Sequence, residues 1–313
     1  MERVQRLIVT ASREPVIEMR YRPDFRVDPW LTMAPLQHGR GDPTTRLLPS
    51  AIWRATRTPH GPATLRLTRD GADLAVLAWG PGSAWALAAL PRLLGAEDEP
   101  ERFQPRHPLL SHLQRRFRGL RFGRSDAVVE ALLPAVLEQK VTGIEARTSY
   151  RAIIRTHGER APGPGVLWIS PLPGRLTATP THAYHRLGVE ERRAVTLRRI
   201  GALADRLEAT TMLPGPEARA RLQTLPGIGP WTAAEVGRVA FGDPDAVSIG
   251  DYHVPSLVSW ALAGEPRGDD ARMLELLEPY AGQRARVVRL LELAGDHPPR
   301  RGPRLAPRSI AGI

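Results

Sequence analysis

The sequence contains no cysteine, and this absence excludes several kinds of chemistry. The chain cannot form disulfides, cannot hold zinc or an iron–sulfur cluster through cysteine, and cannot use a catalytic thiol. Lysine is nearly absent too, because Lys140 is the only one beside many arginines. A general replacement of lysine by arginine along the chain explains the high ratio of arginine to lysine without a functional cause.

Long uncharged segments are also lacking. The longest one, Leu74–Pro91, has Gly80-Pro81-Gly82-Ser83 in its middle, which is typical of a strand, a turn and a short helix and not of a membrane helix. Charged residues between Glu2 and Glu14 interrupt any hydrophobic segment of a signal peptide. We therefore expect a soluble, cytoplasmic protein with no membrane partner.

Positive charge is present in excess. The 313 residues include 44 Lys and Arg against 33 Asp and Glu, which gives a formal net charge of +11 and a pI of about 11.1. This excess favours an anionic partner, and nucleic acid first. Hydrophobic residues make up 42% of the chain, enough for a folded core, and the length fits one large or two modest domains.

Two regions of different pattern follow one another. Residues 1–97 alternate apolar and polar side chains and read as β structure, whereas residues 109–295 have helical periodicity. Between them, residues 98–108 are acidic and then Pro-rich, as in a linker, and the basic, Pro-rich residues 296–313 are expected to form a disordered tail. The expected fold class is α+β: a small antiparallel β-rich N-terminal domain followed by an all-helical domain.

Local signals predict some details of these elements. Arg69-Asp70-Gly71 lies between two alternating segments and predicts the turn of a β-hairpin. Ser125 is expected to cap a helix whose apolar residues recur from Val128 to Leu137. Pro134 is expected to kink or split that helix.

The most informative segment is Leu222–Ala234, with the sequence LQTLPGIGPWTAA. It reads as a helix end, a tight turn and a new helix that begins near Pro230. Gly227 and Gly229 allow unusual backbone torsions and leave room for a phosphate to approach the amides at the start of the second helix. A helix–turn–helix packing corner is the alternative interpretation of two glycines alone.

The whole segment resembles the hairpin of the helix-hairpin-helix DNA glycosylase superfamily. Members of that family carry a catalytic aspartate at a fixed distance past the hairpin, at the start of the next helix. Asp251 lies 22 residues beyond Gly229, so the resemblance implies that Asp251 is the catalytic carboxylate. Taken on its own, an aspartate there is also explained as a helix N-cap.

A further match lies upstream of the hairpin. Gln139-Lys140-Val141-Thr142 is similar to the family's Gln-x-Val-Ser or Gln-x-Val-Thr, and Gly119-Leu120-Arg121-Phe122 looks like the loop that precedes that helix in the family. In the relatives, the residue after this glutamine fills the gap left by an extruded nucleotide, which here is Lys140. The likeness is greatest to the bacterial 3-methyladenine DNA glycosylase II type, which also has an N-terminal antiparallel β domain.

The resemblance implies a monofunctional DNA glycosylase of base excision repair. Such an enzyme flips a damaged base, foremost an alkylated base such as 3-methyladenine, out of duplex DNA and hydrolyses its N-glycosidic bond. Bifunctional relatives have a lysine nucleophile where this chain has Trp231, so no Schiff base is expected here. The implied DNA-binding residues are Gln139, Lys140, Gly227, Ile228, Gly229, Trp231 and Thr232.

The resemblance also suggests pocket and metal residues. Trp231 and Glu235 fall at positions that line the base pocket in relatives, although Trp231 fits a core equally well by type and Glu235 is either a polar group that reads the base or an exposed residue. The family's hairpin holds a monovalent cation through main-chain carbonyls. The matching positions are Gln223, Leu225 and Ile228.

Two alternatives stay open at this stage. The chain is either a glycosylase for deaminated or oxidised bases, or a non-catalytic helix-hairpin-helix protein that only binds DNA. In each case we expect double-stranded DNA as the partner, association with the nucleoid through DNA, a monomer, no required cofactor and no iron–sulfur cluster.

Overall fold

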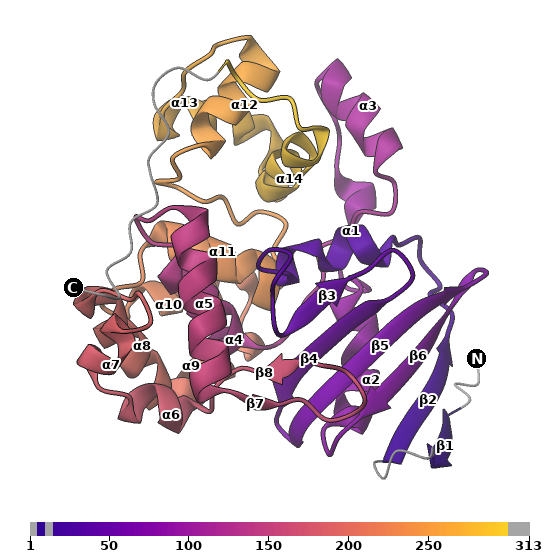
Figure 1. Ribbon diagram of the computed structural model, residues 1–313. Helices are drawn as coiled ribbons and strands as arrows, with labels where there is room; N and C mark the ends of the chain where they lie inside the picture. Colours follow the sequence, from indigo (N-terminus) through magenta and orange to yellow (C-terminus); the bar gives the residue numbers. More distant parts are fainter. Residues whose placement is uncertain (1–4, 10–14, 300–313) are drawn as a thin grey trace.

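The computed structural model describes residues 5–9 and 15–299 (Figure 1). An antiparallel sheet built from the N-terminal residues lies on one side, and a larger group of helices from the rest of the chain lies beside it. The expected fold class, α+β with a β-rich N-terminal part followed by helices, is confirmed. The expected domain boundaries at residues 97 and 108 stay a prediction.

The sheet has six strands, and all neighbouring strands run antiparallel. The strands span β1 Gln5–Val9, β2 Pro15–Tyr21, β3 Thr45–Leu47, β4 Ile52–Thr58, β5 Gly61–Asp70 and β6 Asp73–Trp79. Their order across the sheet is β1-β2-β6-β5-β4-β3. The predicted hairpin joins β5 to β6, and Gly71 in its turn has a φ of +61°, a torsion that favours glycine.

One face of the sheet is covered by helix α2, Ser83–Leu93 (Figure 1). Alternate strand residues such as Leu67 and Val76 point to this face and are fully buried, together with Leu87 and Leu90 of the helix. This layer forms the first hydrophobic core of the molecule.

Helices make up most of the remaining chain. They span α1 Pro29–Met33, α3 Pro108–Arg116, α4 Val128–Leu137, α5 Gly143–His157, α6 Pro173–Ala178, α7 Thr181–His185, α8 Glu191–Ala202, α9 Ala204–Glu208, α10 Gly215–Gln223, α11 Pro230–Ala240, α12 Val254–Ala263, α13 Asp270–Leu277 and α14 Arg284–Ala294. Helices α4 to α11 share a second core, and α3 packs with α12, α13 and α14 around a third, seen together in Figure 1.

Helix α4 differs from its prediction at its cap and in not being split, while a kink at Pro134 stays a prediction. Ser125 does not cap it, because the first free amides, those of Val128 and Val129, donate to the carboxylate of Glu208 at 2.9 Å each. That cap comes from α9, far away in sequence, so no local pattern could indicate it. Pro134 does not split the helix either, since the buried apolar residues around it hold the helix in the core.

The segment predicted as a linker, residues 98–108, is packed against the helical part of the molecule, where Phe103 joins the third core. Its Asp98 side chain is 0% exposed and forms an ion pair with Arg286 of α14. Asp98 also accepts a hydrogen bond from the amide of Phe122 at 2.9 Å. A buried, paired carboxylate of this kind fixes the connection between the sheet and the helices.

A small two-stranded hairpin was not expected in the helical part. Strands β7 Glu159–Arg160 and β8 Trp168–Ile169 pair with each other, and the amide of Trp168 donates to the carbonyl of Pro43 at 2.8 Å. Ile169 packs with Ala55 of β4 in a small separate cluster. The Pro- and Gly-rich stretch after α5 therefore docks the helices onto the sheet.

The C-terminal tail predicted for residues 296–313 lies mostly outside the described residues, which end at 299; residues 296–299 contain neither helix nor strand. Among the helices that the structure describes, none combines the length and the apolar character needed to span a bilayer.

Candidate active site at the hairpin

The hairpin predicted from the sequence joins α10 to α11 through a tight turn. The amide of Ile228 donates to the carbonyl of Leu225 at 2.9 Å. Gly227 has a φ of +100°, and a Cβ there would lie 2.3 Å from Oγ1 of Thr196, so both torsion and space require glycine.

Gly229 serves a different purpose. Its φ is −95°, which any residue adopts, and a Cβ placed on it would meet nothing within 4 Å. The residue is exposed and directly precedes Pro230, the first residue of α11. A glycine here therefore leaves open space above the start of the helix, where backbone amides and the helix dipole favour an anion.

Gln139 connects the end of α4 to this hairpin. Its Nε2 donates to the carbonyl of Gly227 at 2.9 Å and to Oγ1 of Thr232 at 2.8 Å. Thr232 is buried, so its hydroxyl holds Gln139 and does not itself face solvent. The structure thus brings together three of the predicted DNA-binding residues from two separate segments.

Lys140 follows at the surface with a φ of +55°, one of two positive values among the non-glycine residues described. Ile228, another predicted DNA-binding residue, is buried in the helical core, so only its backbone faces the hairpin surface. A left-handed torsion at a long side chain is strained, and such strain is commonly found at functional positions.

Asp251 is held by three hydrogen bonds. Its Oδ1 accepts from the amides of His253 at 2.7 Å and Val254 at 2.9 Å, which cap the start of α12. Its Oδ2 accepts from the indole Nε1 of Trp231 at 2.9 Å. The same carboxylate therefore caps α12 and bonds to the hairpin helix α11. The Asp251 side chain is half-buried.

The contact with Asp251 gives Trp231 a role that the sequence did not indicate. The indole is half-buried, and its polar edge is used by the carboxylate. Trp231 is not among the residues that line the cavity described next. Its predicted place in a base pocket stays a prediction, whereas its hydrogen bond to Asp251 is a feature of the structure.

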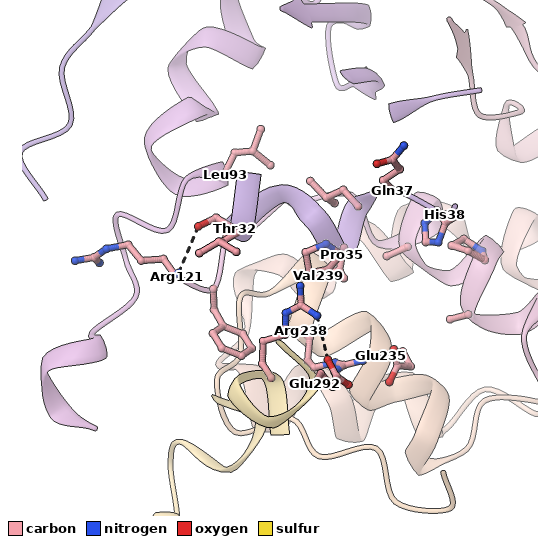
Figure 2. Close-up of a pocket in the computed structure, with 18 of the residues that line it drawn as sticks. Thr32, Pro35, Gln37, His38, Leu93, Arg121, Glu235, Arg238, Val239 and Glu292 are labelled. Carbon is pink, nitrogen blue, oxygen red and sulfur yellow. Dashed lines mark hydrogen bonds and ion pairs between the residues drawn. The ribbon is translucent and has the colours of Figure 1, made fainter. Parts of the chain in front are cut away.

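A cavity of about 270 Å³ lies where the three hydrophobic cores meet (Figure 2). Leu36 and Leu93 belong to the core of the sheet, Leu120 to the core around α14, and Ala131 and Ala135 to the core around α4. One wall is the N-terminal segment 31–39, opposite α11 and α14. Both parts of the chain are therefore needed to enclose this cavity.

The lining is unusually polar for a cavity between cores. Its hydrogen-bonding side chains include Gln37, His38, Glu138, Arg147, Glu235, Arg238, Arg289 and Glu292. Glu235, which the resemblance placed at the pocket, is here and faces Arg238 and Glu292 in Figure 2. Among the lining residues that the structure describes, Phe122 and the imidazole of His38 supply the aromatic rings.

Most of these charges are already paired. Glu235 binds Arg238 through one oxygen and accepts from Ser248 through the other. Glu292 pairs with Arg289 at 3.1 Å and lies 3.7 Å from Arg238. Burial by itself would lower the pKa of Arg238, but these two carboxylates raise it, so the guanidinium stays charged.

Besides Arg238, two titratable groups of the lining have shifted pKa values, Glu138 and His38. Burial raises the pKa of Glu138 to about 7, and the negative charges of Glu235 and Asp251 add to the effect. Burial lowers the pKa of His38, although the Asp42 and Glu130 carboxylates oppose that shift. With a pKa of about 7, Glu138 is partly protonated at neutral pH.

The monovalent cation site stays a prediction. Of its three expected carbonyls, at Gln223, Leu225 and Ile228, that of Leu225 already accepts the amide of Ile228. A carbonyl oxygen has two lone pairs, so this bond leaves it able to bind a cation as well. In the part of the chain that the structure describes, no three His, Cys, Asp or Glu residues gather as a metal site would require.

Solved structures with the same architecture are DNA glycosylases. The chain superimposes on the 3-methyladenine DNA glycosylase of Archaeoglobus fulgidus with a TM-score of 0.75 and 20% identity, over 88% of this chain and 97% of that one. The Clostridium acetobutylicum 8-oxoguanine glycosylase/lyase in complex with duplex DNA superimposes with a TM-score of 0.69 and 12% identity, over 93% of this chain and 96% of that one. The 3-methyladenine DNA glycosylase of Schizosaccharomyces pombe in complex with abasic DNA superimposes with a TM-score of 0.51 and 17% identity, over 63% of this chain and 96% of that one.

Comparison with protein-family models and with curated protein sequences gave no match. The structural neighbours differ in the lesion that their names give, so their likeness concerns the architecture and not a substrate. The hairpin, the aspartate beyond it and the N-terminal sheet together form the fold of the helix-hairpin-helix type DNA glycosylases.

Proposed function

We propose that this chain is a monofunctional DNA glycosylase that hydrolyses the N-glycosidic bond of damaged bases in duplex DNA. One observation carries the proposal. The carboxylate of Asp251, 22 residues past the hairpin, is turned toward the hairpin helix and held there by Trp231. DNA binding alone does not need a carboxylate in this position, because an acidic group repels phosphates.

The hairpin would hold the DNA backbone. The open space above Gly229 lets a phosphate approach the first amides of α11, and such contacts are independent of base sequence. Lys140, which is exposed next to Gln139, would fill the gap left in the stack when the damaged nucleotide is flipped out. The net charge of +11 adds long-range attraction to DNA.

Asp251 would carry the chemistry. Cleavage of the bond between C1′ and the base nitrogen builds positive charge on the sugar, as in other glycoside hydrolysis. A fixed carboxylate stabilises that charge, and it accepts a proton from the attacking water. Because three hydrogen bonds already orient Asp251, little reorganisation is needed when the charge develops.

The product would be an abasic site with an intact strand. A strand-cleaving glycosylase needs an amine nucleophile, and the position next to the hairpin that would carry it is Trp231. Lys140 is the only lysine of the chain, and it follows Gln139 at the end of α4, on a different segment from Trp231.

Alkylated bases are the first substrate class that we propose, in accord with the 3-methyladenine type that the hairpin region resembles. Deaminated or oxidised bases are the second. The cavity favours including them, because its lining of carboxylates, guanidiniums and amides suits a base read through hydrogen bonds.

Base release from defined duplexes tests the proposal. Purified protein would be incubated with randomly methylated DNA and with duplexes containing uracil, hypoxanthine or 8-oxoguanine. We expect free damaged base and abasic sites that break only on alkali treatment. Release of no base by the wild type, together with equally tight DNA binding by Asp251→Asn, would reduce the chain to a DNA-binding protein. Strand breaks without alkali would contradict the monofunctional mechanism.

A further inference from the structure

We propose that Glu138 donates a proton to the departing base and thereby allows the enzyme to excise bases that are uncharged before cleavage. This inference rests on the proposed glycosylase function and adds a second catalytic carboxyl group to Asp251.

The position of Glu138 places it between the hairpin and the cavity. It directly follows the last residue of α4, and its amide donates to the carbonyl of Pro134 at 3.0 Å. The next residue, Gln139, is bonded to the hairpin through Gly227. The side chain of Glu138 lines the cavity, so one short segment contacts both the DNA-holding turn and the space available to a base.

The carboxyl group of Glu138 is unused by the fold. Within residues 16–299, where side chains are described, it accepts no hydrogen bond and has no ion-pair partner within 4.0 Å. The other two carboxylates of the cavity are occupied, since Glu235 holds Ser248 and Arg238, and Glu292 holds Arg289. Among the acidic side chains of the lining, Glu138 is therefore the one free to meet a ligand.

Charged and titratable groups face Glu138 from every element around the cavity. Glu235 and Arg238 of α11, Arg147 of α5 and Asp251 before α12 act on it directly. The other charged or titratable side chains of the cavity lining are His38 after α1, Arg121 before α4, and Arg289 and Glu292 of α14. Burial has the largest effect and raises the pKa, the carboxylates of Glu235 and Asp251 raise it further, and the guanidiniums of Arg147 and Arg238 oppose them. With a pKa of about 7, Glu138 is a proton donor at the pH of the cell.

A proton donor matters for some bases and not for others. A base that is cationic through alkylation leaves as a neutral molecule when the electron pair of the C1′–N bond moves onto it. A neutral base would leave as an anion, which is slow unless a proton reaches one of its nitrogens or oxygens. Here the proton of the Glu138 carboxyl would move to the base as that bond breaks.

The remaining atoms balance through water. The oxygen of the attacking water forms the new bond to C1′ while one of its protons goes to Asp251, so the products are the neutral base carrying the Glu138 proton and an abasic sugar. Before the next turnover Asp251 loses its proton to solvent and Glu138 regains one from solvent. Two carboxyl groups in different surroundings thus take opposite roles, one as acid and one as base.

The test compares two lesions and two variants under single-turnover conditions. The lesions are hypoxanthine, which is neutral, and 7-methylguanine, which is cationic. In Glu138→Gln and Glu138→Leu we expect hypoxanthine release to slow by about 10²-fold or more, within the usual range for loss of an acid catalyst. The rate for 7-methylguanine is expected to fall by less than about tenfold, since that base needs no proton. Glu191→Gln, an exposed position on α8, is the matched control.

The pH profile gives a second readout. For the wild type, hypoxanthine release should fall as pH rises through about 7, because only the protonated form of Glu138 donates. This dependence should vanish in Glu138→Gln, which has the same shape but no transferable proton. Melting temperatures of both variants show whether the fold is intact.

Each outcome is decisive. Equal slowing for both lesions, an unchanged pH profile in Glu138→Gln, or a wild type that releases only the cationic base would overturn the role of Glu138 and leave the glycosylase function standing. A wild type that releases neither lesion nor any base from methylated DNA would overturn the proposed function itself.

Discussion

The hairpin with its aspartate and the cavity beside it are built in opposite ways. The hairpin, Trp231 and Asp251 come from one continuous stretch of about thirty residues, and each contact in it is short in sequence. The cavity is enclosed by segments that are up to about 260 residues apart, from Leu31 to Glu292. The chemistry of the site is thus local in the chain, whereas the space for a base depends on the whole fold.

This difference separates two properties of the proposed site, its chemistry and its selectivity. The hairpin can be kept while the cavity changes, because few side chains take part in both. Glu138 and Gln139 are the connection between them, since one faces the cavity and the other holds the turn.

Replacing Asp251 by Asn should have the largest effect. The isosteric amide keeps the cap but cannot stabilise the cationic sugar, so base release should slow by about 10³-fold, close to 4 kcal/mol of barrier. The loss should be equal for every lesion, because it removes the chemistry and leaves the cavity. Single-turnover rates on two lesions measure this, and a loss confined to one lesion would contradict the assignment.

The two glycines of the turn form a matched pair. Gly227→Ala must fit a side chain at positive φ against Thr196, and we expect it to lower the free energy of unfolding by about 2 kcal/mol. Gly229→Ala meets no atom and has an ordinary φ, so its melting temperature should match the wild type while duplex DNA binding weakens. Thermal denaturation and fluorescence anisotropy check both. If Gly229→Ala bound DNA as tightly as wild type, the phosphate would not approach there.

Trp231→Phe tests whether Trp231 acts with the hairpin and Asp251 or contacts the base in the cavity. Phenylalanine keeps the ring but removes the hydrogen bond to Asp251, so release should slow about tenfold, the effect of about 1.4 kcal/mol. If Trp231 only positions Asp251, the rate constant falls alike for all lesions and KM is unaffected. A rise in KM that differs between lesions would show instead that the indole contacts the base.

Lys140→Gly should change the stability least, and any change should be an increase. Removing a side chain from a φ of +55° relieves strain of about 1 kcal/mol, although glycine gains entropy in the unfolded chain. We expect a melting temperature no lower than that of the wild type, with slower base release because nothing fills the gap in the duplex. Lys140→Asn, which tolerates the same torsion, is the control.

The sequence indicated the parts whose signals are local. The β5–β6 hairpin follows from Arg69-Asp70-Gly71, and the turn between α10 and α11 follows from its own prolines and glycines. The resemblance to the glycosylase hairpin pointed to Asp251, and the structure joins this residue to Trp231 of the hairpin helix.

What the sequence could not indicate depends on contacts between distant residues. The cap of α4 comes from Glu208, and the supposed linker is fixed by an ion pair between Asp98 and Arg286. The unpaired state of Glu138 is of the same kind, because it depends on which carboxylates the arginines of α11 and α14 have already taken. An apolar pattern predicts which residues are buried, but it does not predict which polar groups pair with one another.

The wall contributed by segment 31–39 has a consequence for the proposed glycosylase function. The helical part carries Asp251, yet the sheet-bearing portion supplies one side of the cavity, including Gln37 and His38. If this cavity receives the damaged base, remodelling of that N-terminal portion would change which lesions are accepted while the hairpin and Asp251 stay as they are.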